Sequence, residues 1–242
     1  MQKSVEAVSR DNLTSRVYQQ LRSSLMEGRF WPGHRFKIRE LAAAMGVSET
    51  PVREAVMQLV TEKGLEMKAA KSITVAHLSL AQYLELREIR LHLEGMAAEA
   101  ATSKISYSTI EELKHLHAAL IKAEDEGRWS DALQMNWRFH HTIYREAGMP
   151  ELLALIEGIW LRNGPLVNFQ YPLARPTYPG DHQHLNILAA LEKRDPAGVG
   201  SALQADLKEG GVGLVNLLGR IEAGEIDAES LRMKATMSAS AA

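Results

Sequence analysis

The sequence contains no cysteine among its 242 residues. Disulfide bonds and metal sites built on thiolate ligands are therefore excluded. It also lacks an apolar run of the roughly 20 residues that a membrane-spanning helix needs. The N-terminal stretch MQKSVEAVSRDNL has no apolar core of the kind found in secretory signal peptides. We therefore expect a cytoplasmic protein that does not associate with membranes.

Neither sign of charge dominates, since the chain has 28 Lys and Arg residues and 30 Asp and Glu residues, which gives a formal net charge of −2. The charges are divided unevenly along the chain. Residues 1–76 carry 12 basic and 8 acidic side chains, whereas the rest carries 16 basic and 22 acidic ones. A local basic excess favours binding to nucleic acid, although an excess of this size is a weak signal.

Catalytic motifs of fixed spacing are absent as well. The sequence has no G-x-S-x-G, no H-E-x-x-H and no phosphate-binding P-loop. Gly210, Gly211 and Gly213 lie inside a helical pattern and follow no predicted strand. We therefore predict that the protein is not an enzyme, and a metal-dependent enzyme is the alternative that turnover without DNA would reveal.

The strongest positive signal is a helix-turn-helix pattern in residues 39–65. Apolar residues at helical spacing run up to Gly46, which is expected to end the first helix. Ser48 is a typical N-cap residue and Pro51 a typical first-turn residue, so a second helix is predicted to start here. In this motif, the N-terminal end of the second helix enters the major groove of DNA.

Short elements on both sides complete a small domain. Apolar residues at every fourth position predict a helix over residues 13–27. The β-prone runs LEMK and SITVA, separated by three residues, predict a hairpin within residues 65–76. Residues 1–76 are therefore predicted to form a winged helix-turn-helix domain with a small β-hairpin.

The chain after residue 76 is predicted to be helical throughout, so the protein as a whole is mainly α. The expected helices cover residues 78–102, 108–126, 130–147, 150–169, 180–193 and 195–224. Ser130 is the expected N-cap of the third, and the fourth should bend or end near Pro165. Residues 77–225 are thus predicted to form an all-α antiparallel bundle. Residues 226–242 lack an apolar face and are predicted to be a disordered tail.

The N-terminal pattern matches a family and not only a motif. The run EGRFWPGHRFKIRELAAAMGVSETPVREAVMQLVTEKGLE resembles the winged-helix DNA-binding domain of the GntR family of bacterial transcription regulators. Agreement at so many spaced positions by chance is very improbable. The resemblance implies a homodimer that binds double-stranded operator DNA, more often as a repressor than as an activator.

The C-terminal part is similar to the all-helical ligand-sensing domain, the FCD domain, of the FadR branch of this family. The matching positions are Arg90 with Glu94, the run from Asn136 to His140, His184, and Asp195 at the start of the last helix. With the N-terminal match, the resemblance covers about residues 13–220. It implies control of DNA binding by a small-molecule effector.

From this resemblance we expect DNA contacts from Arg39, Ser48, Thr50 and Arg53, with Lys37 and Lys71 on phosphates. Two positions depart from the family pattern. Glu49 replaces a residue that is usually basic. Its carboxylate either accepts a hydrogen bond from a cytosine amino group or repels the DNA phosphates and lowers the affinity. The wing tip reads Ala-Ala-Lys-Ser, without the Arg-Gly pair that enters the minor groove in many relatives. Without the resemblance, Arg53 could simply pair with Glu49 or Glu54 on a solvated helix face.

The resemblance also implies a divalent metal site in the helical domain. The ligand positions of the family correspond to Asn136, His140, His184 and Asp206. Two imidazoles and a carboxylate suit zinc, nickel or manganese, whereas the neutral amide of Asn136 weakens the site. His182 or His141 are candidate substitutes, but His141 lies about 100° around the helix from His140. The alternative is a polar effector pocket without metal, in which His140 and His184 donate hydrogen bonds.

The effector is expected to be an organic acid. Arg87, Arg90, Arg162 and His182 are the candidate effector-binding residues. A guanidinium binds a carboxylate through two hydrogen bonds, which favours the arginines for this role. Each arginine could instead belong to an ordinary ion pair, most obviously Arg90 with Glu94. A regulator in which the metal itself is the effector is a second alternative.

Overall fold

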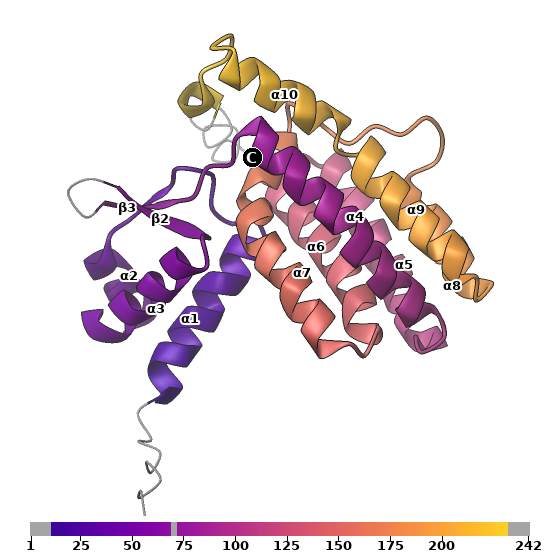
Figure 1. The fold of residues 1–242 in the computed structure, drawn as a ribbon, viewed down its shortest axis with the longest axis horizontal. Coiled ribbons are helices and arrows are strands. Elements are labelled where there is room, and N and C mark those ends of the chain that lie inside the picture. Colours follow the sequence, from indigo (N-terminus) through magenta and orange to yellow (C-terminus); the bar gives the residue numbers. More distant parts are fainter. Residues whose placement is uncertain (1–10, 69–71, 232–242) are drawn as a thin grey trace, which may run out of the picture.

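The computed structural model describes residues 11–68 and 72–231. Two units are visible in Figure 1, a small N-terminal unit of three helices with a sheet and a larger bundle of helices. The predicted mainly α fold is confirmed. Within the described residues, no helix is long and apolar enough to span a membrane.

The N-terminal unit contains α1 (Asp11–Met26), α2 (Ile38–Met45) and α3 (Glu49–Thr61). The predicted hairpin consists of β2 (Leu65–Lys68) and β3 (Ser72–Val75), which pair in antiparallel fashion. A third strand, β1 (Arg35–Phe36), pairs with the other side of β3 and gives the order β1-β3-β2. Strand β1 was not predicted from the sequence, because two residues are too few to show an alternating pattern.

The turn of the helix-turn-helix depends on Gly46. Its φ of 65° is left-handed, a conformation that side chains with a Cβ disfavour. From this conformation the amide of Val47 reaches the carbonyl oxygen of Ala42 at 3.0 Å, as in a Schellman cap. The helix that follows is anchored by five buried residues, Pro51, Val52, Ala55, Val56 and Leu59.

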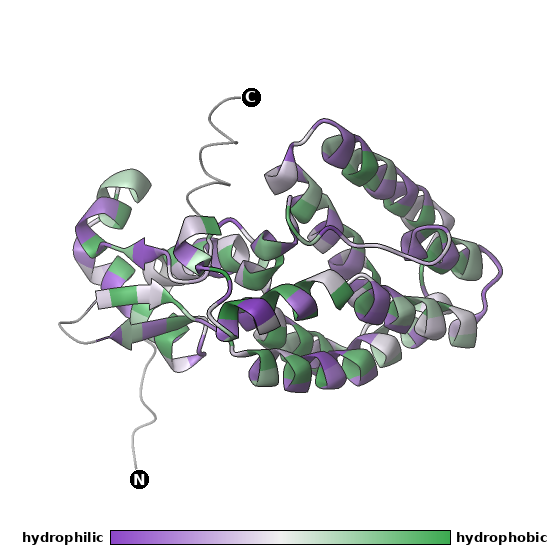
Figure 2. Cartoon of the chain, turned by 90° about the horizontal axis from the view of Figure 1, so that it is seen from above, coloured by the Kyte–Doolittle hydropathy of each residue, from purple (hydrophilic) through white to green (hydrophobic). Residues whose placement is uncertain are grey.

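The helical bundle begins after the sheet. It contains α4 (Leu80–Thr102), α5 (Tyr107–Asp125), α6 (Trp129–Glu146), α7 (Pro150–Asn163), the 3-10 helix η2 (Gly164–Gln170), α8 (Gln183–Glu192), α9 (Pro196–Glu209) and α10 (Val212–Glu222). The expected change near Pro165 is confirmed, since α7 ends there and continues as η2. Figure 2 shows that these helices carry hydrophobic and hydrophilic residues on different sides, as helices that pack into a bundle should.

Two predicted helix ends were wrong. α6 begins at Trp129 with Arg128 at the N-cap position, so Ser130 lies in the first turn instead of capping it. The single helix predicted for residues 195–224 is broken between α9 and α10 at Gly210 and Gly211. A Cβ on Gly210 would lie 2.8 Å from the hydroxyl oxygen of Tyr178, so the break makes room for a side chain from a distant loop.

The prediction of a disordered tail does not hold for residues 226–231, the first six residues of that tail. Leu231 is buried and packs in an apolar cluster with Leu217 and Leu218, and Ile226 contacts the same cluster. Asp227 accepts a hydrogen bond from the backbone amide of Ser230 and starts a last helical turn. Two apolar side chains are too few to show a periodic face in the sequence. Residues 232–242 lie outside the described residues.

The two units pack closely along α7 and η2, where α1 lies beside α7 in Figure 1. A Cβ on Gly164 would lie 2.7 Å from the carbonyl oxygen of Met26, so only glycine allows this approach. Likewise, a Cβ on Gly64 would lie 2.7 Å from Cγ of Leu161. The start of η2 is therefore in direct contact with the end of α1.

Candidate functional site

The N-terminal end of α3 presents an exposed polar surface. Ser48, Glu49, Thr50 and Arg53 are all exposed there, because the buried residues of α3 occupy its opposite face. Lys37 and Arg39, at the start of α2, are exposed as well. Lys71 lies in the wing tip, outside the described residues. The residues predicted to contact DNA, as far as the structure describes them, are thus open to solvent.

Arg53 and Glu49 form an ion pair on the helix surface, which the sequence left open as the alternative to a DNA contact by Arg53. Nη2 of Arg53 lies 3.5 Å from Oε2 of Glu49, and the two side chains are 64% and 51% exposed. Exposed pairs of this kind contribute little stability, typically less than about 1 kcal/mol. Arg53 can therefore exchange Glu49 for a base or a phosphate at small cost. The hydroxyl of Ser48 makes no capping bond within the described chain, which leaves it available as well.

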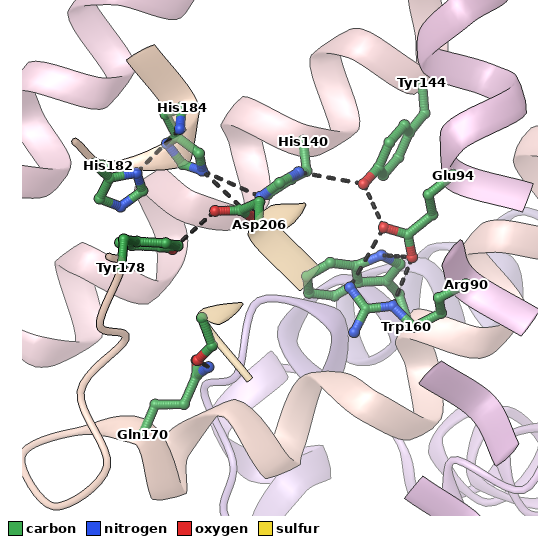
Figure 3. A network of polar contacts seen from close by, with 11 residues as sticks. Arg90, Glu94, His140, Tyr144, Trp160, Gln170, Tyr178, His182, His184 and Asp206 are labelled. Carbon is green, nitrogen blue, oxygen red and sulfur yellow. Dashed lines mark hydrogen bonds and ion pairs between the residues drawn. The ribbon is translucent and has the colours of Figure 1, made fainter. Parts of the chain in front are cut away.

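A buried polar cluster lies in the middle of the helical bundle (Figure 3). His140 of α6, His184 of α8 and Asp206 of α9 converge there, each less than 9% exposed. Nε2 of His140 lies 3.1 Å from Oδ2 of Asp206 and 3.2 Å from Nε2 of His184. One ligand atom from each of the three lies within 4.8 Å of the others. Asn136, one turn before His140, lines the cavity beside them.

The protonation states of this cluster follow from its surroundings. Burial alone would raise the pKa of Asp206, but hydrogen bonds with His140 and Tyr178 and the nearby imidazoles hold it well below its usual range. Burial lowers the pKa of His184 well below its ordinary value. Near neutral pH, the cluster therefore presents an ionised carboxylate and a neutral imidazole, the forms that bind metal ions.

A second polar group continues from His140 towards α4. Nδ1 of His140 lies 3.3 Å from the hydroxyl oxygen of Tyr144, and that hydroxyl donates to Glu94. Glu94 is fully buried and also accepts from Nε1 of Trp160 at 3.0 Å and from Nε of Arg90 at 2.6 Å. Arg90 thus forms the ion pair with Glu94, within α4, that the sequence offered as the alternative to an effector contact. Its guanidinium also lies over the Trp160 ring, 4.4 Å from the centroid.

These groups enclose a small cavity of about 50 Å³. Its polar lining includes Arg90, Asn136, His140, Asn163, Tyr178 and Asp206. The volume is enough for a few water molecules or a metal ion with a very small ligand. Asn163 is 1% exposed, and both polar atoms of its side chain lack a hydrogen-bond partner among the described residues. A buried amide left unpaired is costly, so Asn163 marks a position where a ligand can bond.

The structure brings only some of the predicted effector residues to this cavity. Arg90 and His182 line it, whereas Arg162 lines another cavity, of about 330 Å³, beside strand β2. Arg162 was misplaced because Trp160 and Asn163 face the first cavity, and a residue between them on the helix points elsewhere. Arg87 lies one turn before Arg90 but outside the lining of the cavity, and its Nε is buried.

Two neighbouring histidines extend the cluster. His182 caps α8 through its ring, and His117 of α5 was missed by the sequence analysis. Burial lowers the pKa of His182 to about 4 and lowers that of His117 as well. The only signal for His117 is its place in a stripe of buried leucines on α5, where a polar residue is unusual. His141, the other candidate substitute, turns away and contacts Glu157.

Two family models match the chain. The model described as bacterial regulatory proteins, gntR family, matches residues 13–75, and the FCD domain model matches residues 85–209. The chain belongs to the GntR family of regulators with an FCD domain. Regulators of this family bind operator DNA and, through the FCD domain, small-molecule effectors. The protein is a transcription regulator and not an enzyme.

Curated relatives and solved structures support this assignment. The HTH-type transcriptional regulator McbR of Escherichia coli K12 is 34% identical over 190 residues, covering 77% of this chain and 86% of that protein. The HTH-type transcriptional repressor RspR of the same strain is 26% identical over 198 residues, covering 81% of this chain and 86% of that one. The solved structure of E. coli McbR/YncC superposes with a TM-score of 0.78 at 31% identity, covering 87% of this chain and 99% of that one.

Proposed function

We propose that this regulator is a homodimeric repressor whose binding to DNA is controlled by a small organic acid. The acid binds in the cavity of the helical domain, beside a divalent metal ion held by His140, His184 and Asp206. The observation that carries the proposal is the convergence of these three buried donors, of which His140 and Asp206 line a cavity that Arg90 also lines.

The donor set supports a metal such as zinc, nickel or manganese. Two imidazole nitrogens and one carboxylate oxygen come from three different helices and lie within reach of one ion. Asn136 lines the same cavity with an amide in place of the family's carboxylate. A bound ion would supply positive charge and free coordination positions for a carboxylate. With Asp206 as its one anionic ligand, the site would keep a net positive charge.

The remaining lining supports a small acid that carries a further polar group. Arg90 lines the cavity, and its ion pair with Glu94 holds the guanidinium in place while neutralising part of its positive charge. The amide of Asn163 offers a donor and an acceptor, which together suit a hydroxyl or carboxyl group of the ligand. A cavity of about 50 Å³ admits only a small molecule unless the surrounding helices move apart.

Helix η2 connects the cavity with the DNA-binding domain. Val167 and Gln170 line the cavity. Between them, Asn168 donates a 3.1 Å hydrogen bond to the carbonyl oxygen of Phe30 in the N-terminal unit. Phe169 packs edge-on against Trp31, with 5.4 Å between ring centroids. A ligand that changes the position of η2 would therefore change how the DNA-binding domain is held. Such a ligand would bind one placement of that domain more tightly than another and so shift the equilibrium between them.

Exposed apolar side chains support the homodimer. Ile89 and Met96 lie two turns apart on one face of α4, at 39% and 50% exposure. Leu155 is 60% exposed on α7, which packs against α4. Burying these residues against a second copy would remove apolar surface from water. Dimerisation would also match the two-fold symmetry of a palindromic operator.

The test is operator binding by the full-length protein, measured by fluorescence anisotropy on a DNA fragment selected from random sequence. We expect one or more small carboxylic acids to weaken binding when metal is present and to have less effect after chelation. If metal alone changes the affinity and no acid adds to the effect, the protein is a metal sensor instead. If neither has any effect, the proposed control is wrong although DNA binding stands.

A further inference from the structure

A second group of histidines lies beside the His140 site. His117 belongs to α5, His182 directly precedes α8 and His184 lies in its first turn. The ring centroids are 5.0 Å apart for His117 and His182, 5.4 Å for His117 and His184, and 4.4 Å for His182 and His184. One ring nitrogen from each lies within 4.8 Å of the other two. This spacing allows all three rings to reach one central ion.

Two of these rings have an unused nitrogen in a buried position. Nδ1 of His117 and Nδ1 of His184 have no hydrogen-bond partner among the residues that the structure describes. A neutral imidazole has one donor and one acceptor, and leaving either unpaired away from water costs free energy. The neighbouring positions on α5 are apolar, so a leucine at 117 would avoid this cost. Unpaired nitrogens on two buried rings whose centroids lie 5.4 Å apart indicate a ligand between the rings.

The third ring is fixed in place by the backbone. Nδ1 of His182 accepts a 3.1 Å hydrogen bond from the amide of His184, which holds the ring against the first turn of α8. Tyr178 packs on the same ring, with centroids 4.6 Å apart. An ion bound through Nδ1 would take the lone pair that now caps the helix. The ring would need little reorientation, because it already lies beside His184.

We propose that His117, His182 and His184 form a second position for a divalent transition-metal ion, distinct from the position that contains Asp206. Three imidazoles without a carboxylate favour Cu²⁺ or Zn²⁺ over Mn²⁺. The two positions share His184, so an ion in one affects the other. The proposal does not depend on an organic acid effector, because it concerns nitrogen ligands only.

The experiment removes the first position and asks whether metal still binds. In full-length protein, His140→Gln with Asp206→Asn disables the first position and leaves the three histidines intact. We expect this double variant, stripped with chelator, loaded with Cu²⁺ and dialysed, to retain copper near stoichiometry. Its electron paramagnetic resonance spectrum should show coupling to several nitrogens. Adding His117→Gln should remove the bound copper.

The matched control adds His115→Gln to the same double variant. His115 lies on α5 two residues before His117 but is exposed, so this change should leave copper binding intact.

The proposal is overturned if the double variant holds no copper, or if the His117→Gln and His115→Gln additions behave alike. When the parent protein binds metal and the double variant does not, only the second position fails. Both positions fail if the parent binds none. Should the double variant not fold, the same comparison applies with Asp206→Asn alone.

Discussion

Arg22 of α1 donates a 2.7 Å hydrogen bond to Glu157 of α7, and this ion pair joins the DNA-binding domain to the helical domain. The other carboxylate oxygen of Glu157 lies 2.8 Å from Nε2 of His141. His141 follows His140 directly on α6, so the backbone next to the buried cluster is connected to α1 through one carboxylate. Both partners in the ion pair are partly buried, with 13% and 21% of their side chains exposed.

Glu157→Gln should weaken the connection between the two domains. Neutralising the carboxylate converts charged hydrogen bonds to Arg22 and His141 into weaker neutral ones. We expect the free energy of unfolding to fall by about 1–2 kcal/mol. The effect of an effector on DNA affinity should decrease as well. Thermal unfolding and anisotropy titrations measure the two effects, with Glu151→Gln, an exposed glutamate on α7, as the control.

The same residue predicts a pH dependence. The hydrogen bond with His141, together with those from Arg22, outweighs burial and lowers the pKa of Glu157 from its ordinary 4.5. Its stabilisation is therefore complete above about pH 4.5 and is lost as the pH falls through the lower pKa of the folded protein. The stability difference between the parent and Glu157→Gln should shrink over that acidic range. A difference that stays constant there would contradict this role.

Arg53→Ala should remove most of the sequence preference in DNA binding. A side chain at the N-terminal end of the reading helix can contact base edges, and a good bidentate contact contributes about 1–3 kcal/mol of discrimination. Glu49→Gln is the informative companion, because it frees Arg53 from its 3.5 Å pair and removes a negative charge from the DNA surface. Competition binding against mutated operators at two salt concentrations measures both. Equal selectivity in Arg53→Ala and the parent would refute this assignment.

Two glycine substitutions should change stability in opposite directions. Gly46→Ala places a Cβ on a residue with φ of 65°, which costs about 1–2 kcal/mol although space is open around it. Gly158→Ala lies inside α7, where nothing within 4 Å meets the new Cβ, so it should stabilise by about 0.5–1 kcal/mol. Urea unfolding of both variants checks the signs. A neutral Gly46→Ala would mean that the turn tolerates another geometry.

His184→Ala should remove metal from the protein. The residue is fully buried and belongs to both groups of potential ligands. Elemental analysis of untagged protein, before and after loading with Zn²⁺, should find metal in the parent and little in the variant. Chelation should lower the melting temperature of the parent, since loss of a ligand that binds only the folded state destabilises it. Metal absent from both proteins after loading would leave a polar pocket without a metal.

Asn163→Leu should separate stability from ligand response. Both polar atoms of the amide are buried and unpaired among the described residues, so an apolar side chain of similar size should leave the free energy of unfolding unchanged or raise it. The variant should also lose the response of DNA binding to the organic acid. A marked loss of stability in the absence of any acid would show instead that the amide has partners of its own.

The parts of this protein that the sequence determined are local. The helix-turn-helix follows from Gly46 and Pro51, whose backbone preferences act within a few residues of each other. Ser48 lies at the N-cap position that its residue type predicts, although its hydroxyl makes no capping bond. The placement of Asn136 and His140 on one helical face follows equally from a spacing of four. Such features need no knowledge of the remaining fold.

Tertiary packing decided everything that depends on distant segments. His117 joined the buried histidines because α5 lies against α8, and no local pattern distinguishes it from an ordinary core position. Arg162 does not line the expected cavity, because Trp160 and Asn163 on the same turn of α7 face that cavity and the arginine between them faces the one beside β2. The break at Gly210 reflects the approach of Tyr178 from another loop. Local propensity acts over one or two turns, whereas these contacts join residues that lie tens of positions apart.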